Sequence, residues 1–159
     1  MLNCNTCAKR AIMHVSVFFF ALLVAPSLFA ALGQDVASVQ SDGVRMKAAA
    51  VNVVPGQAYS VHEMHAAVGT TVREFVSPAG QVFGVSWQGP YKPDLRQLLG
   101  EYFDQYLQAA RSEHRAHSTA VHIETGDLVF ESGGHMRFFV GRAYLRSKLP
   151  DGASADAIR

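Results

Sequence analysis

The sequence predicts an α+β fold, in which two three-stranded meanders form an antiparallel sheet and one long amphipathic helix packs across it. Three observations predict this fold. Short strand-like runs separated by turn residues precede residue 90, a helical period follows from residue 95, and strand-like runs return between residues 120 and 145. The connections within each group of strands are short, which favours antiparallel neighbours.

The first group of strands alternates apolar and polar residues and is interrupted by glycine and proline turns. Its expected strands are Tyr59–His65, Thr71–Val76 and Val82–Trp87. In the third of these, Phe83, Val85 and Trp87 are expected to share a buried face. Gly84, on the opposite face, leaves room for a bulge or a close approach.

The helix has the clearest pattern in the chain. Asp94 stands where an N-cap or a first-turn acid is favoured. Apolar residues then recur at spacings of three and four, which indicates a single amphipathic helix ending between His114 and His117. These apolar residues are Leu95, Leu98, Leu99, Tyr102, Phe103, Tyr106, Leu107 and Ala110.

The second group of strands has the same strand chemistry. Its expected strands are Ala120–Glu124, Leu128–Ser132 and Met136–Leu145. Gly133 and Gly134 are interpreted as the turn before the last strand, since glycine readily adopts positive φ. Residues 57–149 are therefore expected to form one domain and residues 150–159 a flexible tail.

The first thirty residues are typical of an export signal. Lys9 and Arg10 precede an uncharged apolar run from Ala11 to Ala25, and small residues follow at Ala30. Cleavage near Ala30 would place the protein in the periplasm or outside the cell. Leu28 is larger than the residue preferred three positions before the cut, so retention of the segment as a membrane anchor stays open. Residues 31–56 have no stable period and are expected to form a poorly structured leader or arm, in which Asp35–Met46 could form a short helix.

Cleavage would also change the chemistry of the chain. It removes Cys4 and Cys7, and with them disulfides and thiol catalysis. It also takes two of the fourteen basic residues and none of the thirteen acidic ones, so the formal net charge changes from +1 to −1. A nucleic-acid partner is not expected, because such proteins concentrate basic residues on one face. Contact with a membrane is expected only through an uncleaved N-terminal segment.

Two stretches of the chain resemble a known family. VREFVSPAGQVFGVSWQGPYKPDLRQLLGEYF, from Val72 to Phe103, and SGGHMRFFVGRAYL, from Ser132 to Leu145, are similar to conserved blocks of the bacterial domain of unknown function family 2844. This resemblance implies a small exported protein of bacterial origin. It implies no reaction, ligand, cofactor or catalytic residue.

Five histidines are candidate metal ligands. His62, Glu63 and His65 form an HExH sequence, one residue short of the zincin motif, and on a strand the two histidines point to opposite faces. His114 and His117 have i, i+3 spacing near the helix end, where a solvated last turn is the competing interpretation. A composite site of His65, His122 and His135 requires their strands to be neighbours. The candidates are His65, His114, His117, His122 and His135.

Support for catalysis is thinner. Ser132 lies near His135 in sequence, but the GxSxG elbow of serine hydrolases is absent. The sequence therefore favours a noncatalytic binding or accessory module with an envelope protein partner, whose sheet edges could accept a strand. A histidine-based metal-binding protein is the alternative, and a hydrolase is a weaker one. No catalytic residue, bound metal or cofactor is assigned.

Overall fold

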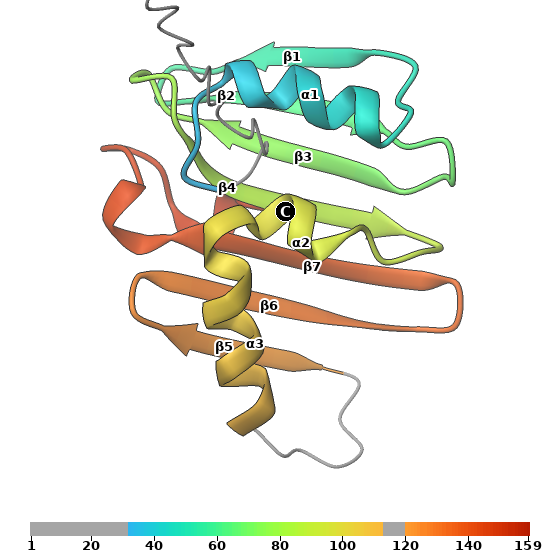
Figure 1. The fold of residues 1–159 in the computed structure, drawn as a ribbon. Coiled ribbons are helices and arrows are strands. Elements are labelled where there is room, and N and C mark those ends of the chain that lie inside the picture. Colours follow the sequence, from blue (N-terminus) through green and yellow to red (C-terminus); the bar gives the residue numbers. More distant parts are fainter. Residues whose placement is uncertain (1–31, 113–119) are drawn as a thin grey trace, which may run out of the picture.

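The computed structural model describes residues 32–112 and 120–159, and these form an α+β fold built on one antiparallel sheet (Figure 1). The seven strands lie in the order β1-β2-β3-β4-β7-β6-β5, so that β4 and β7 are joined at the centre. The strands are β1 Val51–Pro55, β2 Ser60–His65, β3 Thr71–Val76, β4 Val82–Gly89, β5 Val121–Thr125, β6 Leu128–His135 and β7 Phe138–Leu145.

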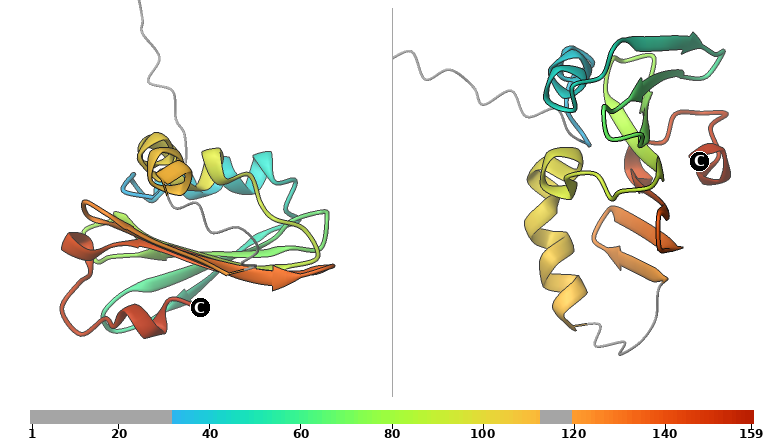
Figure 2. Two further views of the ribbon diagram at one scale, coloured as in Figure 1. Left: turned by 90° about the horizontal axis from the view of Figure 1, so that it is seen from below. Right: turned by 90° about the vertical axis from the view of Figure 1, so that its right-hand side faces the viewer.

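The helices cover one face of the sheet, and the end of the chain crosses the other (Figure 2). We call these the helix face and the strap face, and we call residues 149–159 the C-terminal strap. The helical segments are α1 Ala37–Arg45, α2 Leu95–Leu99, η1 Gly100–Tyr102, α3 Phe103–Ser112, η2 Arg146–Lys148 and η3 Ala155–Ala157. Among the described residues, no helix has the length and apolar character needed to cross a membrane.

The sequence-based expectation for residues 31–56 was wrong. Instead of a loose arm, these residues provide α1 and the edge strand β1, and the side chains of Leu32 and Val39 are fully buried. The segment is anchored by its main chain as well, since the Leu32 amide donates to the Leu98 carbonyl. Both elements are too short to show a period, and their order comes from packing on the sheet.

The single long helix was also an incorrect expectation. The apolar stripe is continuous, but Gly100 has φ +51°, which ends α2 and turns the chain through η1 into α3. Asp94 is the N-cap as expected, because its carboxylate accepts hydrogen bonds from the amides of Arg96 and Gln97. The expected helix end, between His114 and His117, lies outside the described residues, as does the expected signal peptide.

The last hairpin turns later than expected. Gly133 and Gly134 belong to β6, and the turn consists of Met136 and Arg137, between the paired residues His135 and Phe138. Arg137 takes the positive φ, at +63°. Gly134 also has positive φ, and a Cβ there would lie 2.2 Å from the Phe138 carbonyl oxygen. That glycine is therefore needed for close strand approach.

The C-terminal strap is packed and not a flexible tail. Ile158 is buried beside Phe75 and Phe83 in a second apolar cluster on the strap face. A Cβ on Gly84 would lie 2.9 Å from the Ile158 side chain, so Gly84 makes the room that the strap occupies.

A bulge in β4 explains why Phe83 faces the strap. Phe75 pairs with Gly84 and Val76 with Val82, which leaves Phe83 as an extra residue. Phe83 therefore does not share a face with Val85 and Trp87, as the simple alternation predicted.

The main core lies between the helices and the sheet and depends on Trp87. Its ring contacts Phe130 of β6, with centroids 5.6 Å apart, and Phe130 in turn contacts Tyr106 of α3 at 4.5 Å. The Trp87 ring lies against Gly141, its partner on β7, where an added Cβ would be 2.1 Å from Cζ2. No side chain fits at position 141 without displacing the ring.

This packing predicts that alanine substitutions at two neighbouring glycines differ in their effect on stability. Gly141→Ala should lower the free energy of unfolding by about 1–3 kcal/mol, because the new methyl group overpacks the core. Gly133→Ala should change it by less than about 1 kcal/mol, since nothing lies within 4 Å of its Cβ position. Urea denaturation measures both. Equal destabilisation by the two variants would contradict the contact between Trp87 and Gly141.

Candidate functional site

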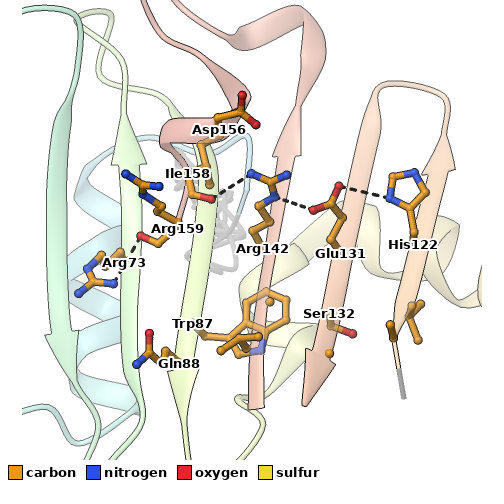
Figure 3. Close-up of a pocket in the computed structure, with 15 residues that line it drawn as sticks. Arg73, Trp87, Gln88, His122, Glu131, Ser132, Arg142, Asp156, Ile158 and Arg159 are labelled. Carbon is orange, nitrogen blue, oxygen red and sulfur yellow. Dashed lines mark hydrogen bonds and ion pairs between the residues drawn. The ribbon is translucent and has the colours of Figure 1, made fainter. Parts of the chain in front are cut away.

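The strap face contains a groove with a volume of about 800 Å³, between the C-terminal strap and the edge strand β5 (Figure 3). Gly133 lines this groove without a side chain, and a Cβ there would meet nothing within 4 Å. The lining residues are Arg73, Trp87, Gln88, Ala120, Val121, His122, Glu131, Ser132, Gly133, Val140, Gly141, Arg142, Asp156, Ile158 and Arg159.

One row of paired residues crosses all seven strands at this groove. Each residue is the register partner of the next, so all seven side chains belong to the same face of the sheet. From β1 to β5 the row is Asn52, Glu63, Arg73, Ser86, Arg142, Glu131 and His122. Every member is polar. From the central Ser86 toward either edge of the sheet, the next residue is an arginine and the one after it is a glutamate.

The charges of this row are paired within the sheet. Arg73 Nε lies 2.6 Å from Glu63 Oε2, and Arg142 Nε lies 2.7 Å from Glu131 Oε2. His122 Nδ1 lies 3.3 Å from Glu131 Oε1, which extends the row to the edge strand. These contacts hold the charged groups in place before any ligand arrives.

The two arginines also hold the C-terminal strap. Arg142 Nη1 donates to the Ala155 carbonyl at 2.8 Å and to the Ile158 carbonyl at 3.5 Å. Arg73 Nη1 donates to the Arg159 carbonyl at 3.4 Å. Figure 3 shows Ile158 and Arg159 between these two side chains. One wall of the groove is therefore fixed by hydrogen bonds from arginine side chains to main-chain carbonyl groups of the strap.

The pKa shifts in the groove stabilise the charged forms. The hydrogen bond from Arg142 lowers the pKa of Glu131, and the same bond raises the pKa of Arg142. Neither shift brings the pKa of the group closer to neutral pH, where a general acid or base works best. The arrangement is suited to binding by fixed charges and hydrogen bonds.

The histidines do not assemble into the composite site considered from the sequence. His65 is on β2 and His122 on β5, five strand positions apart, which at 4.7–4.9 Å per strand is roughly 24 Å. His65 contacts Glu63 at 3.2 Å, and His135 packs near Phe138 at the hairpin tip. His114 and His117 lie outside the described residues.

Within residues 32–112 and 120–159, no group of three or more His, Cys, Asp or Glu side chains could hold a metal ion. His122 contacts Glu124 at 3.1 Å through Nε2 and Glu131 through Nδ1, so its two nitrogens serve different carboxylates. Ser132 and His135 are three residues apart on β6, which directs their side chains to opposite faces. The structure does not support the nucleophile and base pairing considered for these two residues.

A second polar cluster lies inside the core on the helix face. Asp42 of α1 lies beside Glu74 of β3, and one carboxylate oxygen of Asp42 accepts a hydrogen bond from the side-chain amide of Gln97 on α2. Both carboxyl groups are almost completely buried, and neither oxygen of Glu74 has a hydrogen-bond partner among the described residues. Two buried carboxylates repel each other, so protonation of one of them is favourable.

Burial is the main cause of the pKa shifts in this pair. It raises the pKa of Asp42 to about 6, despite the opposing hydrogen bond from Gln97. Burial, followed by the negative charge of Asp42, raises the pKa of Glu74 well above its usual value. His62 pairs with Glu74 in register, and burial lowers the pKa of its imidazole.

The sequence contained a signal for Glu74 but not for Asp42. Glu74 alternates with Val72 and Val76 in β3, which places a carboxyl group on the buried face of a strand. Arg73, Glu131 and Arg142 occupy the alternate positions of their strands, but only the register of the finished sheet shows that they meet. These groove residues were not identified from the sequence.

The buried pair predicts a pH-dependent stability. A carboxyl group whose pKa is raised by folding stabilises the folded state fully below its unfolded pKa, and this contribution is lost as pH rises through the folded pKa. Glu74→Gln keeps the shape of the side chain and removes its titrating proton. Relative to the wild type, this variant should therefore gain unfolding free energy as the pH rises from 4 to 8.

Urea denaturation across this pH range measures the difference. His62 contributes with the opposite sign, but it is present in both proteins and cancels in the comparison. Glu101→Gln, which removes an exposed carboxyl group, is the matched control and should show no such trend. If the difference in unfolding free energy between the wild type and Glu74→Gln stayed constant across this pH range, the raised pKa of Glu74 would be refuted.

Comparison with known proteins gives a family and no activity. No curated protein matches the chain, and no solved structure matches it. The family model described as "Protein of unknown function (DUF2844)" matches residues 28–158. This range includes the buried carboxyl pair and every lining residue of the groove except Arg159, the last residue of the strap. The chain therefore belongs to the DUF2844 family.

Proposed function

We propose that this protein is a noncatalytic binding module of the cell envelope and that the groove on the strap face holds an extended segment of a partner protein. The observation that carries the proposal is the groove itself, whose charged residues are paired before binding. Such preorganisation lowers the cost of ordering side chains when a partner arrives. The envelope assignment follows from the signal-like first thirty residues.

The lining of the groove fits a peptide. Arg142 and Glu131 offer opposite charges on adjacent strands and His122 adds an imidazole on the edge strand, while Val121 and Val140 add apolar surface. The volume of about 800 Å³ lies within the range of ligand pockets. Mixed charge along a groove selects a partner by complementarity more than by total affinity.

The titratable groups support binding more than catalysis. Glu131 and Arg142, the groove residues with shifted pKa, are both stabilised in their charged forms. A general acid or base would need the opposite kind of shift, toward the working pH. No observation in the described part of the chain favours the histidine-based metal site or the hydrolase over this proposal.

The test uses a substitution that fills the groove and is expected to leave the fold intact. Gly133→Leu adds a side chain where a Cβ meets nothing within 4 Å, and the wild-type backbone there does not require glycine. Asn52→Leu adds a leucine on the exposed edge strand β1, outside the groove, as the matched control. Affinity capture from envelope extracts should recover the same partner with the wild type and Asn52→Leu, and at least tenfold less with Gly133→Leu.

Two results would contradict the proposal. One is equal recovery of the partner with all three proteins, and the other is recovery of no reproducible partner with folded wild-type protein. Circular dichroism and urea denaturation establish that Gly133→Leu is folded before its binding is compared.

A further inference from the structure

Four of the eight exposed large apolar side chains of the described residues gather at one end of the sheet. This end, on the right in Figure 1, comprises the α1–β1 link, the β2–β3 turn, the β4–α2 loop and the β6–β7 hairpin. Four large apolar residues project from these turns, and their exposed fractions are 58% for Val68, 61% for Tyr91, 90% for Met136 and 45% for Phe138. We call this surface the hairpin end.

The turns of the hairpin end are in contact with one another. Thr70 Oγ1 donates to the Tyr91 carbonyl at 2.8 Å, which joins the β2–β3 turn to the β4–α2 loop. The Lys92 ammonium lies 5.4 Å from the centroid of the Phe139 ring, which joins that loop to the β6–β7 hairpin. The apolar side chains therefore project from one continuous surface.

The hairpin end is also basic. Its turns, residues 46–50, 66–70, 90–94 and 136–137, contain Lys47, Lys92 and Arg137 but only one acidic residue, Asp94. Asp94 is occupied as the N-cap of α2. Positive charge beside exposed apolar side chains matches an anionic lipid surface, where cations bind headgroups and apolar tips enter the acyl boundary.

The opposite end of the described fold lacks both features. Its loops, residues 32–36, 56–59, 77–81, 126–127 and 146–159, contain none of the exposed large apolar residues of the described chain. They contain four acidic and three basic residues. Of the two ends of the described fold, only the hairpin end thus combines exposed apolar side chains with an excess of basic residues, and this difference would orient the molecule relative to a surface.

We infer that the hairpin end binds the surface of an anionic phospholipid bilayer, with Met136, Phe138 and Tyr91 inserted at the headgroup level and Lys47, Lys92 and Arg137 contacting the phosphates. The apolar residues stand on separate turns, so they enter between headgroups without forming the flat core of a protein interface. This contact is independent of the groove and of the N-terminal segment. It adds a second route to the membrane, one built into the folded domain.

Vesicle co-sedimentation tests the inference with the full chain. The wild type should bind vesicles of phosphatidylglycerol mixed with phosphatidylcholine, and this binding should weaken as salt is added, because salt screens surface charges. Binding to vesicles of phosphatidylcholine alone should be at least tenfold weaker, since each of several cations contributes roughly fivefold on an anionic surface. All variants carry the same residues 1–31, so any binding by that segment is constant.

Two variants probe the hairpin end. Met136→Ser removes the most exposed apolar tip, and Arg137→Glu reverses a charge in the same turn. Together they should lower partitioning onto the anionic vesicles at least tenfold. The matched control combines Val54→Ser with Lys148→Glu, which makes the same kinds of change away from the hairpin end and should leave binding unchanged.

Three results would overturn the inference. One is equal partitioning of the wild type and the Met136→Ser, Arg137→Glu double variant onto the anionic vesicles. Another is equal binding of the wild type to both kinds of vesicle. The third is binding of the wild type to soluble polyglutamate and not to vesicles. The last result would assign the hairpin end to an acidic protein. Gly133→Leu should bind vesicles like the wild type, so failure of the peptide proposal and failure of this one are separable.

Discussion

The ring of Trp87 lies against Gly141 at the centre of the sheet, where β4 joins β7. This contact positions Phe130, on which Tyr106 of α3 packs, and so connects the central strands to the helix layer. In the register Gly141 pairs with Trp87, so a side chain at position 141 would lie on the helix face, against the ring of Trp87. The packing of the core on that face therefore depends on the absence of a methyl group at position 141.

Charged residues are arranged differently on the two faces of the sheet. On the strap face, carboxylates meet arginines that are partly exposed, and the ions remain charged. On the helix face, Asp42 and Glu74 lie side by side in the core, where burial raises the pKa of both carboxyl groups and favours their neutral forms. Only the strap face therefore presents paired charges to a ligand.

Local chemistry made much of the fold predictable, and long-range packing accounts for what was missed. The N-cap Asp94 and most of the strand ranges could be predicted from short stretches of sequence. Gly100 interrupts a continuous apolar stripe, and nothing in that stripe shows that the glycine has positive φ. α1 and β1 are too short to show a period. The groove joins Arg73, Arg142 and Glu131, and their meeting depends on the pairing of β4 with β7, which no local pattern encodes.

The way in which the strap is held has a consequence for how its sequence can diverge among relatives. Arg73 and Arg142 bond to carbonyl oxygens, which every amino acid possesses, so residues 155 and 159 can be exchanged without loss of these contacts. Ile158 alone is constrained by shape, because it fills the space above Gly84. Evolution can thus alter the chemical character of one groove wall, and with it ligand preference, while its anchoring is preserved.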